Sequence, residues 1–115
     1  MADPRIRQIK IKTGVVKRLA KEYIVYEKEA ELQKVRIQKL KDSDADEYNI
    51  KKQEEVLQEA LMIIPDCQRR LVKAYEDLRT TIDNEPDLKE HQDVVTAGEM
   101  LKSAEEHLPE SALKS

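Results

Sequence analysis

The side chains that most often do chemistry are few in this sequence and poorly spaced for it. The two histidines, His91 and His107, lie sixteen residues apart, and neither has a cysteine or a carboxylate pair at ligand spacing. Zinc sites take their Cys and His ligands from short, regular intervals, so this spacing does not favour one. The single cysteine, Cys67, has no histidine near it in the sequence that would activate it as a nucleophile. With no glycine-rich phosphate loop either, we expect no metal, no cofactor and no enzyme active site.

Charge dominates the composition and is unevenly distributed. Charged residues make up 39% of the 115 residues, and the formal net charge is −3. Residues 1–42 hold 12 Lys and Arg against 6 Asp and Glu, residues 43–85 hold 6 against 11, and residues 86–115 hold 3 against 7. The basic N-terminal part either neutralises acidic helices of the same chain or offers a face to an acidic partner. We expect no nucleic-acid partner, since the chain is acidic overall and its basic run from Arg5 to Lys21 has no aromatic residue for base stacking.

The composition favours long helices in one domain. The chain has only two glycines, no Phe and no Trp. A β-sheet needs β-branched and aromatic runs separated by frequent turns, so an all-α fold is predicted. A single cysteine excludes an internal disulfide and fits a reducing compartment. Because no apolar run resembles a signal peptide or a membrane span, we expect a soluble, cytoplasmic protein with no membrane partner.

A seven-residue repeat of apolar residues predicts the first helix, over about residues 4–42. Asp3 is a good N-cap, and Pro4 suits the first helical position, where its missing N–H costs nothing. From there the repeat is sustained over about four heptads, as in the seam of a coiled coil. The seam residues are Ile9, Val16, Tyr23, Ala30 and Ile37.

A second repeat predicts a helix over about residues 46–83 that contains a proline. The repeat passes Pro65 without a change of phase, and Ile64 would be a poor N-cap for a helix that began there. We therefore predict one helix, kinked at Pro65, because the proline leaves the carbonyl of Leu61 without its usual donor and costs about 3 kcal/mol in an isolated helix. The seam residues are Ile50, Leu57, Ile64, Leu71 and Leu78.

A third, weaker apolar stripe predicts a helix over about residues 86–108. Pro86 suits its first turn, Pro109 ends it, and residues 109–115 are expected to form a flexible tail. Short connections make successive helices antiparallel, so residues 1–108 are predicted to form an elongated, coiled-coil-like, up-down-up three-helix bundle. The third helix should end beside residue 62. We therefore hypothesise that the kink at Pro65 adapts the second helix to the change from three-helix to two-helix packing.

Several residues outside the predicted seams are candidates for binding a partner. A cluster of exposed aliphatic side chains is typical of a contact surface, here one presented by helices. The alternative is that the seam drifts by one position, so that some of them belong to the core. The two arginines that follow the proline either anchor a partner or pair with Glu within the bundle. The candidates are Ile24, Val25, Leu32, Val35, Met62, Ile63, Arg69 and Arg70.

Several strings of residues resemble one known family. They are similar to the tubulin-specific chaperone A family, also called tubulin-binding cofactor A, from Ala2 to about Leu78, and the similarity loosens through the third helix. The string "IPDCQRRL" is unusual inside a helix, which makes the resemblance specific. The others are "MADPRIRQIKIKTGVVKRLAKE", "YEKEA", "YNIKKQEEVLQE" and "AYEDL".

The resemblance implies a monomeric, rod-like three-helix bundle without enzyme activity, in the cytoplasm and associated with the cytoskeleton. Members of the family capture β-tubulin in a quasi-native state after its release from the chaperonin. They work with the other tubulin-folding cofactors toward an assembly-competent α/β heterodimer, and their helices, not their loops, make the contact. The residues alone leave a second hypothesis open, a structural coiled-coil module that dimerises through the uncovered half of the first two helices as a scaffold or adaptor.

Overall fold

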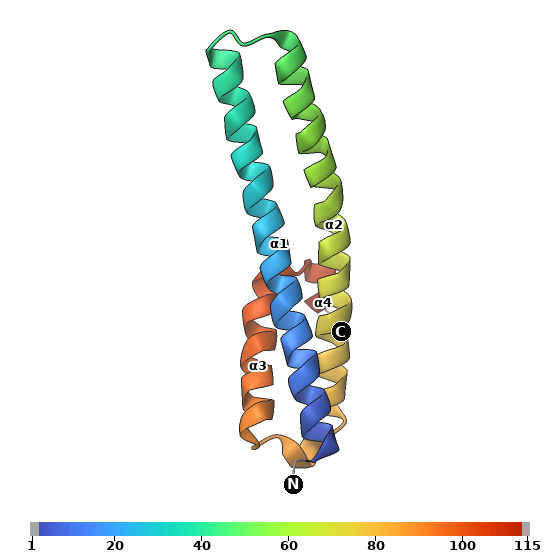
Figure 1. Cartoon of the computed structure of the whole chain (residues 1–115). Coiled ribbons are helices and arrows are strands. Elements are labelled where there is room, and N and C mark those ends of the chain that lie inside the picture. Colours follow the sequence, from blue (N-terminus) through green and yellow to red (C-terminus); the bar gives the residue numbers. More distant parts are fainter. Residues whose placement is uncertain (1–2, 114–115) are drawn as a thin grey trace.

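The computed structural model describes residues 3–113, and this part of the chain is almost entirely helical (Figure 1). No strand occurs in it, so the predicted all-α class is confirmed. None of its helices has the length and apolar character needed to cross a membrane. The elements are α1 (Pro4–Asp42), α2 (Glu47–Asp83), the 3₁₀ helix η1 (Pro86–Leu88), α3 (Gln92–Ala104), the 3₁₀ helix η2 (Glu105–His107) and α4 (Glu110–Leu113).

The two long helices α1 and α2 form an antiparallel hairpin that runs the whole length of the molecule (Figure 1). Side-chain caps fix where each begins: the Asp3 carboxylate accepts from the backbone N–H of Arg5 at 2.9 Å, and that of Asp46 accepts from the N–H of Tyr48 at 3.2 Å. The hairpin turn contains Asp44 at a φ of 54°, a left-handed conformation that Asp tolerates better than most residues. Because the hairpin is long and narrow, the molecule is a rod with extents of 64 × 30 × 16 Å.

Helix α2 passes through Pro65 without ending, as the unbroken seam predicted. The proline is exposed, so its ring lies on the outside of the hairpin. The seam residues on either side of it differ in burial. Leu71 is fully buried, whereas Ile64 is half-buried. The packing around α2 therefore changes close to the proline.

The segment from η1 to η2, residues 86–107, is called the third leg of the bundle here, and it differs from the single helix predicted over residues 86–108. It opens with the short η1, and α3 begins only at Gln92, where Nδ1 of His91 accepts from the N–H of Asp93 at 3.1 Å and caps the helix. Residues 89–93 are all polar, so no apolar stripe holds a helix against the hairpin before Val94. After Ala104 the chain tightens into η2, which ends at His107.

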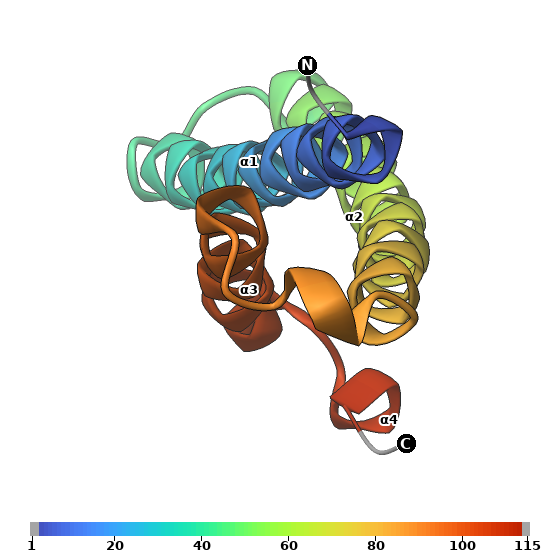
Figure 2. The ribbon, with the colours of Figure 1, turned by 90° about the horizontal axis from the view of Figure 1, so that it is seen from below.

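The main core lies in the half of the rod where α3 packs between α1 and α2 (Figure 2). Each helix contributes the side that it turns toward the other two. Between the level of His107 and the hairpin turn, none of residues 3–113 forms a third element beside α1 and α2 (Figure 1). The buried residues of this core are Ile6, Ile9, Val16, Leu19, Ala20, Leu71, Tyr75, Leu78, Val94, Ala97, Leu101, Ala104, Leu108 and Ala112.

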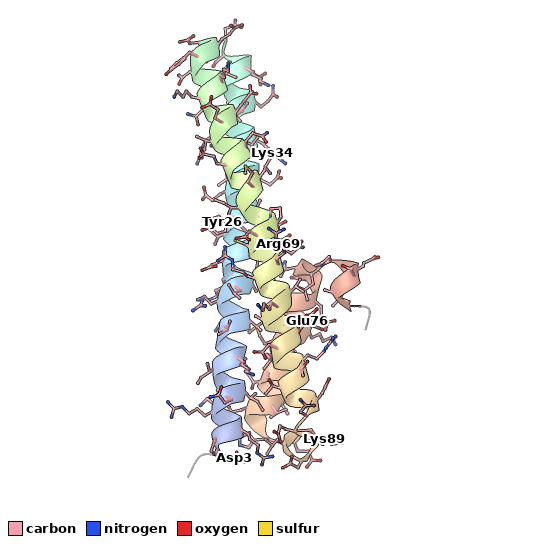
Figure 3. All side chains as sticks on the ribbon, turned by 90° about the vertical axis from the view of Figure 1, so that its right-hand side faces the viewer. Asp3, Tyr26, Lys34, Arg69, Glu76 and Lys89 are labelled. Carbon is pink, nitrogen blue, oxygen red and sulfur yellow. The ribbon has the colours of Figure 1, made fainter. Side chains whose placement is uncertain are left out.

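The predicted flexible tail over 109–115 is wrong for residues 110–113, which form the short helix α4. Ala112 is buried and belongs to the core, because α4 lies beside the outer surface of α2 near Val72 (Figure 3). Leu108 is extended ahead of Pro109, and this lets the chain leave α3 and turn toward α2. Residues 114 and 115 of the predicted tail, like residues 1 and 2 of the predicted domain, lie outside the described residues.

Candidate functional site

The third leg is fastened to the hairpin at its last residue, His107. The carbonyl oxygen of His107 accepts from Nε2 of Gln68 on α2 at 3.1 Å. Its imidazole lies tilted against the ring of Tyr23 on α1, with 5.9 Å between the ring centroids. His107 thus touches both long helices, and it marks the level at which the rod changes from three helices to two.

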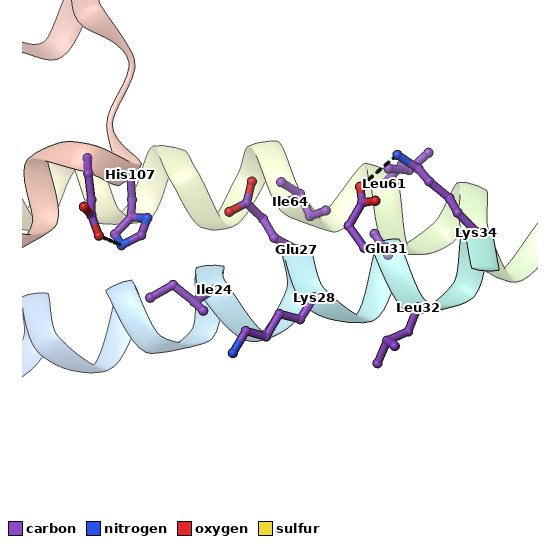
Figure 4. Close-up of a pocket in the computed structure, with 11 residues that line it drawn as sticks. Ile24, Glu27, Lys28, Glu31, Leu32, Lys34, Leu61, Ile64 and His107 are labelled. Carbon is purple, nitrogen blue, oxygen red and sulfur yellow. Dashed lines mark hydrogen bonds and ion pairs between the residues drawn. The ribbon is translucent and has the colours of Figure 1, made fainter. Parts of the chain in front are cut away.

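A groove between α1 and α2 begins at this level and runs toward the hairpin turn, and we call it the distal groove (Figure 4). Its apolar surface comes from Ile24 on α1 and from Leu61 and Ile64 on α2, which are all half-buried. These side chains stay partly exposed because they have one neighbouring helix instead of two. The complete lining is Ile24, Glu27, Lys28, Ala30, Glu31, Leu32, Lys34, Leu61, Ile64, Glu106 and His107.

The charged side chains around the distal groove are mainly acidic where they face it. In Figure 4 Glu27 and Glu31 point toward α2, whereas Lys28 points away from α2. Nζ of Lys34 lies 3.1 Å from Oε1 of Glu31 and is neutralised by it. Burial raises the pKa of Tyr23 at the end of the groove, and its hydrogen bond with Glu27 raises it further. The phenol therefore stays neutral and available as a donor at physiological pH.

The structure distributes the predicted apolar candidates over different surfaces. Ile24 lines the distal groove. Val25, Leu32 and Val35 are about half exposed and follow one another at spacings of seven and three along α1, and Leu32 also lies at the edge of the distal groove. Met62, at 75% exposure, and Ile63, at 40%, lie on α2 beside the proline. If the seam drifted by one position, some of these six residues would be buried in the core. Five of the six are exposed.

The two predicted arginines pair with an acid within the bundle, which is an aspartate of their own helix and not a glutamate. Arg69 and Arg70 are both exposed, and their Nη2 atoms lie 3.4 and 3.0 Å from the carboxylate of Asp66, one turn earlier on α2. Hydrogen bonding to Arg70 lowers the pKa of Asp66 and raises that of Arg70, to which Glu22 on α1 adds a smaller effect. Exposed pairs of this kind contribute little to stability, so both guanidinium groups can be redirected to a partner at small cost.

Sequence reasoning missed that Leu61 and Ile64 belong to an accessible groove. It placed Ile64 in the helix seam and Leu61 beside it, and a repeat alone does not show whether a seam will be covered. The available signal was the length of the third apolar stripe, which is too short to cover the whole hairpin. Tyr26 and Val56 were also missed, and both are exposed on the uncovered half.

Side chains that could bind a metal or act as a nucleophile are not clustered at the groove. Within residues 3–113 no group of three or more His, Cys, Asp or Glu side chains is placed to hold a metal ion. The thiol of Cys67 is buried, with Nη2 of Arg70 at 3.9 Å from its sulfur. The surface available to a partner is therefore apolar and charged, and it is suited to binding a protein.

Comparison with known proteins identifies the family. The sequence model of the family described as tubulin binding cofactor A matches residues 4–106. Tubulin-specific chaperone A of Rattus norvegicus is 58% identical over 103 residues, which cover 90% of this chain and 95% of that one. The solved structure of human tubulin chaperone cofactor A superposes with a TM-score of 0.79 at 54% identity, covering 89% of this chain and 99% of that one. Tubulin-folding cofactor A of Arabidopsis thaliana is 42% identical over 106 residues, covering 90% of this chain and 94% of that one. The chain belongs to the tubulin binding cofactor A family.

Proposed function

We propose that this protein is a tubulin-folding cofactor that binds β-tubulin in a quasi-native state after its release from the chaperonin. It holds β-tubulin on the way to the assembly-competent α/β heterodimer and meets the other tubulin-folding cofactors indirectly, through that shared substrate. In this proposal it acts in the cytoplasm as a monomeric up-down-up bundle, without catalysis. The names of its relatives, which are called tubulin-specific chaperones and tubulin-folding cofactors, support this assignment.

The surface chemistry of the uncovered half of the hairpin supports the same role. A folding intermediate exposes apolar patches beside charged surface, and this half offers exposed aliphatic side chains next to Arg69 and Arg70. Binding of this kind shields the apolar surface by burial alone, so it requires no nucleotide or active site. The observation that carries the proposal is this exposed surface in a chain of the tubulin binding cofactor A family.

Capture of β-tubulin tests the proposal directly. The tagged protein is mixed with β-tubulin released from a chaperonin folding reaction, and α-tubulin from a parallel reaction serves as the control. We expect retention of β-tubulin without α-tubulin. Equal retention of both would contradict the specificity for β-tubulin, and retention of neither would contradict the function.

A second candidate function is a structural coiled-coil module that dimerises through the uncovered half of the hairpin. The half-buried seam residues Leu57 and Ile64 favour it, because a second copy would cover them. Sedimentation separates the two functions. A monomer at tens of micromolar argues against the scaffold, and a dimer at that concentration argues against the monomeric cofactor.

We further propose that α2 bends at Pro65 and that the bend serves the capture of β-tubulin. Pro65 follows Ile64, the last groove residue of α2, and lies three residues before Gln68, which holds the end of the third leg. A bend at this level lets α2 contact α3 on one side of the proline and open the groove on the other.

A further inference from the structure

We propose that the distal groove takes a helix of the β-tubulin folding intermediate, which lies between α1 and α2 as a continuation of α3. This helix is about three turns long, apolar on the side that faces the hairpin and basic along its edges. The proposal rests on the function proposed above and assigns the place where the partner binds.

The distal groove continues the seat of α3 along the same sides of the same two helices. On α1, Ala20 is buried in the three-helix core, and Glu27 follows it by seven residues on the same side of the helix. On α2, Tyr75 is buried beneath α3, and seven-residue steps lead from it to Gln68 and then to Leu61 in the groove. The surface that receives a helix of this chain in one half is therefore the surface left open in the other.

The size of the groove fits a short helix. Its lining on α1 extends from Ile24 to Lys34, which is about 15 Å at the helical rise of 1.5 Å per residue. A helix of about ten residues spans this length in three turns. The groove residues Ile24, Leu61 and Ile64 are half-buried, so an apolar stripe laid over them would bury the area that they still expose.

The charges of the groove select a basic helix. Glu27, Glu31 and Glu106 line it, while Lys28 points away from α2 (Figure 4). Glu31 is paired with Lys34, and Oε1 of Glu106 lies 3.2 Å from Nε2 of His107, so Glu27 is left without an ion-pair partner among residues 3–113. One end of the groove is formed by the C-terminal end of α3 and η2, where the helix dipole places partial negative charge. Lysine and arginine side chains on the edges of a partner helix complement this surface.

The same charges disfavour a second copy of this chain as the occupant. In a two-fold symmetric dimer formed through this groove, each acidic rim would face its own copy. With the two-fold axis near Glu27, the carboxylate of one chain would lie close to the same carboxylate of the other, and like charges brought together in an interface weaken association. The groove is better matched to a different protein.

A charge-reversal pair tests the proposal. Glu27→Lys places a cation at the groove, whereas the control Glu29→Lys makes the same change at an exposed residue two positions further along α1, where the side chain leaves the opposite side of the helix. Affinity is measured by titrating each variant against β-tubulin released from a chaperonin folding reaction. We expect Glu27→Lys to weaken binding by about tenfold or more and Glu29→Lys to leave it within about twofold. The neutral variant Glu27→Gln should fall between them, and circular dichroism checks that all three fold.

A photo-crosslinker at Glu31 provides a second readout, since the peptide of β-tubulin that it captures should be a basic amphipathic helix. Equal binding by Glu27→Lys and Glu29→Lys, with the wild type still binding, would overturn the groove and leave the proposed function standing. A wild type that binds no β-tubulin would overturn both. Self-association of the wild type that Glu27→Lys abolishes would assign the groove to a second copy and overturn the proposal.

Discussion

Nε2 of Gln33 on α1 donates to the main-chain carbonyl oxygen of Gln53 on α2 at 2.9 Å and to its side-chain Oε1 at 2.8 Å. Gln33 is only 4% exposed, and it lies in the half of the rod that has two helices. Because its donors fit only when these two residues are level with each other, the pair holds α1 and α2 in one register. No buried side-chain nitrogen or oxygen in residues 3–113 lacks a hydrogen-bond partner, and this pair contributes to that completeness.

Gln33→Ala should lower the free energy of unfolding by about 1 kcal/mol, since it removes the donor of two interhelical hydrogen bonds. The loss should be local, with faster amide hydrogen exchange around Gln53 than in the three-helix half. Gln38→Ala is the matched control, because Gln38 is exposed and bonds only to Asp42 on its own helix. Denaturant unfolding and hydrogen exchange check both variants, and equal effects would show that Gln33 has no special role.

The sequence predicted the two long helices well because their cores repeat every seven residues and their caps are strong. Asp3 and Pro4 indicated the start of α1, and the apolar repeat indicated that α2 continues through Pro65. The third leg was predicted less well. Histidine is an uncommon N-cap, so the start of α3 after His91 carried little signal.

The candidate site was predictable only in part. Val25, Leu32 and Met62 are exposed as expected, because aliphatic residues outside a seam face away from the partner helix. The groove depends on where α3 ends and on how Leu108 and Pro109 lead the chain away, and no local pattern specifies that geometry. The partner-binding role of all eight predicted residues stays a proposal.

Hydrogen exchange of the protein with bound β-tubulin should show protection over residues 20–40 and 60–72, the segments of α1 and α2 that contain the eight candidate residues. The exposed stripe can be tested separately from the groove with Val25→Ser combined with Val35→Ser, which should weaken capture while changing stability by no more than about 0.5 kcal/mol per site. Both residues are about half exposed, so the core does not depend on them. Unchanged protection in these segments would reject the candidate residues and leave the function intact.

Asp3→Asn should destabilise the protein at neutral pH but not in acid. Hydrogen bonding from Arg5 lowers the pKa of Asp3 below its ordinary value of 3.8. A lowered carboxyl pKa stabilises the folded state above that ordinary value, and the contribution is lost as the pH falls through the lower, folded pKa. Asparagine keeps the N-cap, so the variant removes only the charge. Thermal midpoints of the two proteins should differ at neutral pH and converge as the pH falls through the folded pKa of Asp3, whereas a constant difference would assign the effect to the cap.

Ala112→Glu should release α4 from α2 and lower the free energy of unfolding by about 1 kcal/mol, the order expected for the small apolar area that Ala112 buries. Ser111→Glu, a change of similar size and charge at the exposed neighbour, should have a smaller effect. Limited proteolysis after Leu108 measures the release. Equal cleavage of the wild type and both variants would show that α4 is not held in solution.

Pro65→Ala should raise stability and weaken the capture of β-tubulin. Alanine restores an N–H donor to the carbonyl of Leu61 and removes the ring, which costs a helix interior about 3 kcal/mol, so the gain should approach that value at most. Pro65 is exposed and does not belong to the hydrophobic core, so the substitution leaves the core residues unchanged. If the bend opens the groove, a straighter α2 should bring Leu61 and Ile64 closer to α1 and leave less room for a partner. Thermal unfolding and titration with β-tubulin check the two effects separately, and a stabilised variant with full capture would show that the bend has no part in binding.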